Sequence, residues 1–471
     1  MRRWAVLLAA VQSACATNAG STPATPTRLG STTPALSSSA SDAASPPLPT
    51  LPTSEDPPRS TRESRLVARM LRRVVVARGL AATKSVPGVQ LTRAELIARV
   101  KDHVLRELPS EAIRNEGLAL QLFGFVPTRF DYEAAEYQLL EDQLAGYYEP
   151  SDGTMYMASD LGDDEATATL AHELVHALQD QHWDLERRSK YRPGDGDRSE
   201  AVSALAEGDA TSAMFDVMIA RAAPGSTRSA VDIPDEVFVQ QIRQGISQGP
   251  GADAPRVMRS SLAAPYIYGT LFVNALRRRG GWAAVDQAWD GEPTTTEQVL
   301  HLDKWDAREP ALKVNPPPFA TLGPGWTVAD DDSEGELGAR IAFEEWMDPA
   351  VAAETSKGWG GDRGLLVANG DRSAFAWRLR YDEGAANDGV LAARSYATVA
   401  RALDRQLGPA QARDAAFACR ERTDRGPIAV ARSGDDLIFV FGPARIGASS
   451  WLSAANCALA RRWAKEIAAS P

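Results

Sequence analysis

One segment constrains this chain more than any other: Ala171-His172-Glu173-Leu174-Val175-His176-Ala177. The apolar residues in and around it, among them Leu170 and Leu178, predict a buried helix. Residues four apart lie on the same face of a helix, so His172 and His176 point in the same direction. Two unpaired imidazoles would be costly inside a protein. The pattern therefore predicts that both histidines bind one metal ion.

Glu173 lies about 100° around such a helix from His172. From there its carboxylate can reach a water molecule in the open position of a bound zinc ion. Zinc lowers the pKa of that water toward about 7, and a carboxylate can take its proton during attack on a carbonyl. The sequence thus predicts one Zn²⁺ per chain, held by His172 and His176, with Glu173 as the general base of a hydrolase.

A catalytic zinc needs a third protein ligand, and the sequence offers two candidates. His182 follows His172 by ten residues. However, a continued helix rotates it to about 280° from His172, and Gln179 stands where a chain reversal would need glycine. Glu207 lies on the next predicted helix, among small residues that allow close packing on the first helix. We favour Glu207 as the third ligand and keep His182 as the alternative.

The segment 172–181, followed by Glu207-Gly208-Asp209-Ala210, resembles a group of uncharacterised bacterial gluzincin-type zinc metallopeptidases. The resemblance extends to Gly146-Tyr147-Tyr148 and to the segment Gly358-Trp359-Gly360-Gly361-Asp362. It implies peptide-bond hydrolysis and the zincin fold, in which the active-site helix lies under a small mixed sheet whose edge strand holds an extended substrate. Better-known gluzincins have an aspartate four residues after the glutamate ligand, where this chain has Thr211. The residue that orients a zinc histidine is therefore not assigned, because Asp209 faces elsewhere on an ideal helix.

A tyrosine or histidine from a downstream helix commonly donates a hydrogen bond to the oxyanion in such enzymes. The candidates are His301 and the pair Tyr266 and Tyr268, which precede Gly269. Tyr268 and His301 are preferred over Tyr266. The alternative is that all three residues are packing or surface residues.

Four aspartates near the motif allow two further interpretations. Asp180 and Asp184 either support His176 or are charges on a helix surface, and the surface is favoured. Asp195 and Asp197 lie in a glycine-rich turn that hints at calcium. The turn lacks the spaced series of ligands that calcium needs, so a solvated turn is expected.

The periodicity of apolar residues predicts an α+β protein in two parts. Residues 63–359 form a mainly helical, zincin-like domain with a small sheet, in which residues 145–157 make a hairpin. Residues 360–471 form a C-terminal α+β domain. The helices predicted for the first part span residues 65–80, 92–107, 110–122, 131–144, 164–185, 198–221, 235–244, 266–278, 282–289 and 336–345.

The N-terminus is typical of a bacterial export signal. Arg2 and Arg3 precede an apolar run, and small residues lead to Cys15. Residues 1–15 are therefore predicted to be a lipoprotein-type signal with Cys15 as the lipidated residue, or else a plain secretion signal. Residues 16–62 are rich in Ser, Thr and Pro and predict a disordered linker. The protein is expected to be exported, either anchored in the cell envelope or secreted.

The other two cysteines, Cys419 and Cys457, are an even pair that an oxidising compartment would join in a disulfide, with two buried thiols as the alternative. The net charge of −11 disfavours nucleic acids and anionic membranes as partners. Membrane contact is expected only through the lipid anchor, and the expected partner is a peptide or protein substrate. A cell-wall amidase or a silent zinc-containing binding module remain as alternative functions. The presence of Glu173 disfavours the binding module, because a structural zinc site does not need that carboxylate.

Overall fold

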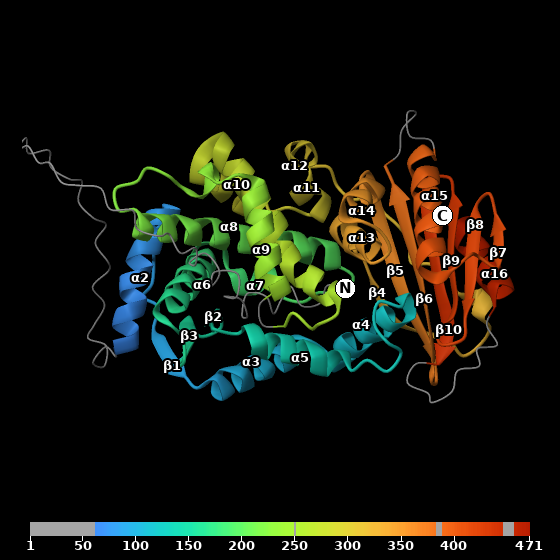
Figure 1. Cartoon of the computed structure of the whole chain (residues 1–471), viewed down its shortest axis with the longest axis horizontal. Helices are drawn as coiled ribbons and strands as arrows, with labels where there is room; N and C mark the ends of the chain where they lie inside the picture. Colours follow the sequence, from blue (N-terminus) through green and yellow to red (C-terminus); the bar gives the residue numbers. More distant parts are fainter. Residues whose placement is uncertain (1–61, 249–250, 383–388, 446–455) are drawn as a thin grey trace, which may run out of the picture.

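The computed structural model describes residues 62–248, 251–382, 389–445 and 456–471. The predicted signal, Cys15 and nearly all of the predicted linker lie outside these residues. Figure 1 shows a mainly helical part at one end of the molecule and a large sheet at the other. The predicted α+β class is confirmed. None of the described helices combines the length and the apolar character that a membrane span requires.

Two long helices form the centre of the helical part. They are α6 (Asp163–Trp183) and α8 (Gly196–Ala222), which pack against each other and against α2 (Arg62–Arg78). Three acidic residues in the first turn of α6 favour its start, because they face the positive end of the helix dipole. Residues 168–179 of α6 are all buried, so the segment that carries the histidine motif is surrounded by protein on every side.

A third helix, α10 (Arg256–Asp290), packs against α8 at unusually short range. A Cβ atom added to Gly208 would lie 2.1 Å from the carbonyl carbon of Gly269, and one added to Gly269 would lie 1.9 Å from the Ala204 oxygen. The two glycines therefore let the backbones of α8 and α10 touch. The backbone of α10 leaves the helical conformation at Gly280 and Gly281, which explains why the sequence predicted two helices there.

A three-stranded sheet lies beside α6. It consists of β1 (Gly88–Leu91), β2 (Gly146–Glu149) and β3 (Thr154–Ala158) in the order β1-β3-β2, so β2 is an edge strand. Strands β2 and β3 are antiparallel and form the predicted hairpin, whereas β1 runs parallel to β3. The sheet is therefore mixed.

The remaining helices of this part surround the centre. Helix α3 begins with a capping box between Thr92 and Glu95, in which each side chain satisfies a free backbone N–H group of the other residue. The bounds of these helices are α3 (Arg93–Glu107), α4 (Ser110–Phe123), α5 (Tyr132–Gln143), α7 (Leu185–Ser189), α9 (Asp235–Gln248), α11 (Thr296–Leu300) and α12 (Leu302–Ala307).

The second sheet has seven antiparallel strands in the order β4-β5-β6-β10-β9-β8-β7. Alternate residues of β10 face opposite sides: Phe439 packs in a core that also contains residues of α3, α4 and α13, and Val440 packs against α16. One core thus joins this sheet to the helical part. The bounds are β4 (Thr327–Asp332), α13 (Gly335–Glu344), α14 (Pro349–Ser356), β5 (Trp359–Asn369), β6 (Arg372–Tyr381), α15 (Val390–Leu407), β7 (Ala412–Asp414), β8 (Phe417–Arg422), β9 (Gly426–Ser433), β10 (Asp436–Arg445) and α16 (Cys457–Ala469).

The sheet includes a strand that the sequence analysis did not predict. Strand β4 pairs with β5 and lies upstream of residue 360, where the C-terminal domain was expected to begin. Its sequence, Thr-Val-Ala-Asp-Asp-Asp, has no alternation of apolar residues, because an edge strand leaves much of its surface in solvent. At the other side of the sheet, Cys419 of β8 and Cys457 of α16 are joined in the expected disulfide.

Candidate metal centre

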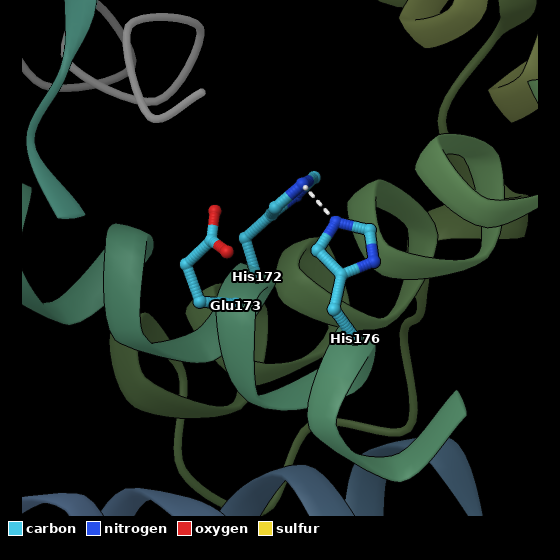
Figure 2. Close-up of side chains that lie close together, drawn as sticks. All are labelled: His172, Glu173 and His176. Atoms are coloured by element: carbon cyan, nitrogen blue, oxygen red, sulfur yellow. Dashed lines mark hydrogen bonds between the residues drawn. The ribbon is translucent and has the colours of Figure 1, made fainter. Parts of the chain in front are cut away.

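Three buried side chains from α6 and α8 converge on one point. The Nε2 atoms of His172 and His176 lie 3.1 Å apart, and Figure 2 shows both rings projecting from the same side of α6. Oε2 of Glu207, on α8, lies 3.0 Å from Nε2 of His172 and 3.6 Å from Nε2 of His176. The structure therefore brings together the three residues that the sequence proposed as ligands.

These three distances fit a shared metal ion. Ligand atoms about 2.0–2.1 Å from a tetrahedral ion lie roughly 3.3 Å from one another. The three separations of 3.0, 3.1 and 3.6 Å scatter around that value. Two imidazole nitrogens and one carboxylate oxygen are also a donor set that divalent transition metals prefer. The site can thus hold one divalent ion with a position left for water or substrate.

Glu173 lies beside this group but has a different partner. Its Oε2 accepts a hydrogen bond of 3.0 Å from the backbone N–H of Tyr148, on the edge strand β2. Ligand atoms of Glu173 and the two histidines all lie within 4.8 Å of one another, and Figure 2 shows the Glu173 side chain next to that of His172. Burial raises the pKa of Glu173 to about 8 in the metal-free protein.

The electrostatics of the three ligands reflect their mutual contact. Burial alone would lower the pKa of His176, but the Glu207 carboxylate outweighs it and raises this pKa to about 9. Burial would likewise raise the pKa of Glu207, yet the two histidines hold it at about 2. Burial dominates at His172 and lowers its pKa. A metal ion that binds here must displace a proton from His176.

Gln179 determines which nitrogen of His176 faces the ion position. The Gln179 Nε2 group donates to the Ala206 carbonyl oxygen at 3.0 Å and to Asp209 Oδ2 at 3.2 Å. This orientation turns Oε1 of Gln179 toward Nδ1 of His176, 2.8 Å away. Because an amide oxygen only accepts, Nδ1 of His176 keeps its proton, and the proton that a metal ion displaces is the one on Nε2.

Asp209 holds the Gln179 amide in this orientation and is itself held by two donors. Its Oδ1 accepts from Nε of Arg78, which is fully buried, at 2.5 Å, and its Oδ2 accepts from Nε1 of Trp289 at 2.9 Å. The aspartate that the sequence could not assign therefore acts on His176 through Gln179. Gln179 was missed as a supporting residue, although its spacing of three residues from His176 places it on the same helix face.

The alternative third ligand lies elsewhere. Nε2 of His182 is 2.7 Å from the carbonyl oxygen of Ala81, on an exposed part of the surface. Asp180 accepts a hydrogen bond from the Tyr148 hydroxyl at 3.0 Å, and Asp184 pairs with Arg187. These two aspartates thus have partners other than His176.

The structure reverses the preference among the oxyanion candidates. The ring of Tyr266 stacks on His172 at a centroid distance of 5.9 Å. The ring of Tyr268 lies under the Arg340 guanidinium instead, and Nε2 of His301 lies 2.9 Å from both carboxylate oxygens of Glu336. Tyr266 is therefore the candidate that lies at the ligands, which does not agree with the expected preference for Tyr268 and His301.

The other aspartates of interest are structural. Asp197 is buried and accepts hydrogen bonds from the backbone and hydroxyl of Thr296, whereas Asp195 pairs with nearby arginines. Asp362, from the segment Gly358–Asp362, accepts from two backbone N–H groups at the start of α13 and from the indole nitrogens of Trp359 and Trp377. It therefore connects β5 to α13 and does not contact the metal ligands.

Comparison with known proteins covers only the C-terminal part of the chain. The profile of a family described as a domain of unknown function (DUF8575) matches residues 326–450. This match begins just before β4 and includes all seven strands of the large sheet. No curated protein and no solved structure matches the chain. The residues of the candidate metal centre lie outside the matched range.

Proposed function

We propose that this protein is a zinc-dependent peptidase of the gluzincin type. The observation that carries the proposal is the placement of Glu207 Oε2 within 3.0 and 3.6 Å of two histidine nitrogens, with the Glu173 carboxylate nearby and held separately by the Tyr148 N–H group. A structural zinc site has no need for such a fourth, separately held carboxylate. Zinc held by His172, His176 and Glu207 would supply a Lewis acid that activates water and polarises a carbonyl.

Glu173 has the geometry of a general base. Its Oε2 is held by the Tyr148 N–H group, which leaves Oε1 to take a proton from the attacking water and pass it to the leaving amine. We assign Tyr266, whose ring stacks on His172, as the hydrogen-bond donor to the oxyanion of the reacting carbonyl. Both groups belong to buried elements, so their positions are fixed before substrate binds.

The edge strand β2 supports a peptide as substrate. The N–H group of Tyr148 bonds to Glu173 of α6 and not to the partner strand β3, so the outer edge of β2 lies beside the candidate metal centre. An extended peptide can pair with such an edge through its backbone, which suits a chain of amino acids better than a small ester. The exported location expected from the N-terminus belongs to the same proposal.

The test combines metal analysis with one conservative variant. The purified protein should contain one zinc per chain and lose hydrolysis of a peptide library on chelation, with recovery when zinc is restored. Glu173→Gln should retain the zinc and lose turnover by about 10²–10⁴-fold, because it deletes the base and no ligand. Glu165→Gln, on the same helix, should behave like wild type.

Two results would contradict the proposal. Zinc retained at full occupancy in His172→Ala would show that the metal lies elsewhere. Turnover of purified muropeptides but not of the peptide library would assign the site to a cell-wall amidase.

A further inference from the structure

A hollow lined by arginines lies at the far end of α6 from its acidic first turn. It has a volume of about 530 Å³ and is formed by α7, the start of α8, the connection between α10 and α11, and the end of α12. Five of its eight lining residues are arginine, in a chain whose net charge is −11. The arginines are Arg187, Arg188, Arg192, Arg198 and Arg308.

The lining of the hollow contains fewer carboxylates than guanidinium groups. Glu292 is shared, because it pairs with both Arg188 and Arg198. Asp290, the other acidic residue of the lining, accepts a hydrogen bond from Nε1 of Trp183. Arg188 also donates to the Trp183 carbonyl oxygen, and Arg198 also pairs with Asp195. Each guanidinium has five N–H donors, so both arginines keep further donors for another acceptor.

Two exposed arginines have the weakest partners. Arg192 lies 3.9 Å from Asp195, at the limit of an ion pair. Arg308 has no carboxylate within 4.0 Å among the residues described in the structure. Its guanidinium lies 3.4 Å from the centre of the Trp305 ring and donates to the carbonyl oxygen of Gly291, which also lines the hollow. These contacts hold the Arg308 charge at the rim without neutralising it.

The backbone at Arg308 adds an independent observation. Arg308 follows α12 with φ of 51°, in the left-handed region where helices commonly end on glycine. Asp184, which pairs with Arg187 of the hollow, has φ of 57°. Among the described residues these two are the non-glycine residues with positive φ; Arg308 lines the hollow, and Asp184 contacts it through Arg187. Non-glycine residues in this region often mark functional sites.

We propose that this hollow binds a phosphate group, either free or as a phosphate ester. Guanidinium groups present paired N–H donors whose spacing matches phosphate oxygens, and a doubly charged anion would supply the acceptors that Arg192 and Arg308 lack. The bound phosphate would connect α7 and α8 to the end of α12. The site is separate from the metal ligands and does not depend on the proposed hydrolysis.

The experiment measures binding of inorganic phosphate and of glycerol phosphate to the zinc-loaded full chain by calorimetry, with chloride at equal ionic strength as the reference. Wild type should bind one phosphate per chain. Arg192→Ala/Arg308→Ala should weaken binding by about tenfold or more, because it removes two charge-assisted contacts. Tighter binding of glycerol phosphate than of inorganic phosphate would identify a phosphate ester as the ligand, and the reverse order would identify free phosphate.

A matched variant separates a site from general charge. Arg72→Ala/Arg73→Ala removes two exposed arginines of α2, outside the hollow, and should bind phosphate like wild type. Arg308→Gly provides a second test, since glycine adopts a positive φ without strain and the fold is retained. The proposal is overturned if wild type shows no heat beyond the chloride reference, if both double variants lose affinity equally, or if Arg308→Gly binds as tightly as wild type.

Discussion

Gln179→Leu should separate the role of the amide from that of the metal ligands. The substitution keeps the approximate size of a fully buried side chain but removes the acceptor at Nδ1 of His176. The His176 ring then loses the contact that fixes which nitrogen carries the proton. Asp209 keeps its hydrogen bonds to Arg78 and Trp289, so the packing of α2 and α10 on α8 is retained.

The expected loss can be estimated in two ways. A buried N–H group left without its partner costs about 1–3 kcal/mol. If the metal-bound state bears that cost, the dissociation constant for zinc rises by about 5-fold to 150-fold. Removing the partner of a metal-bound histidine typically lowers metal affinity by about 10–100-fold. Both estimates predict a rise of one to two orders of magnitude, with zinc still bound at saturating concentration.

Competition with a chromophoric chelator measures this constant directly. Thr211→Val is the control: its side chain is buried on α8, four residues after Glu207, and its Oγ1 has no hydrogen-bond partner among the described residues. It should bind zinc like wild type. If Gln179→Leu also binds zinc with unchanged affinity, the amide does not orient His176 and the reasoning from its hydrogen bonds is refuted.

Three further predictions concern the third ligand, the helix contact and the pH dependence of stability. Glu207→Ala should abolish stoichiometric zinc, whereas His182→Ala should leave metal content unchanged; the opposite ranking in metal analysis would reassign the ligand. Gly269→Ala should lower the free energy of unfolding by roughly 1–3 kcal/mol or more, because its methyl group would overlap the α8 backbone. Gly162 has open space around it, so the control Gly162→Ala should change the free energy of unfolding little. Denaturant titration measures both values. Burial raises the pKa of Glu297 to about 8 from a reference value of 4.5. The folded state therefore binds this proton more tightly, and the contribution to stability is lost as pH rises from about 4.5 to 8, at no more than about 1.4 kcal/mol per pH unit. Glu297→Gln should flatten that slope, and an identical slope in both proteins would show that Glu297 is ionised throughout.

The local sequence pattern was sufficient to predict much of the fold and the placement of His172 and His176 on one face of α6. The apolar spacing that predicted a helix over residues 164–185 corresponds to α6, because apolar residues of its buried central segment, residues 168–179, pack in a hydrophobic core. The hairpin at residues 145–157 was predicted by its turn residues. Strand β4 was not predicted, since an edge strand with three consecutive aspartates has no apolar pattern to detect.

The buried contact between Arg78 and Asp209, which holds Gln179 in place, could not be derived from local sequence. Arg78 and Asp209 are 131 residues apart, and their contact depends on how α2, α6 and α8 pack together. An ideal helix places Asp209 about 200° from Glu207, so the sequence suggested that it faces away from the metal. It does face away, and Gln179 spans the gap to His176. A search for amides three residues from each histidine would have found this residue.

The position of Tyr266 shows how one long-range contact determines a site residue. The sequence places Tyr266 and Tyr268 about 200° apart on the same helix, so only one of them can face α8. Gly269 lies about 60° from Tyr266 and about 100° from Tyr268 around the helix axis. Because Gly269 is the residue at which α10 touches the α8 backbone, Tyr266 lies closer to the face that α8 covers. The sequence contains the glycine but does not show that α8 packs on it, and this contact accompanies the approach of both Tyr266 and Glu207 to His172.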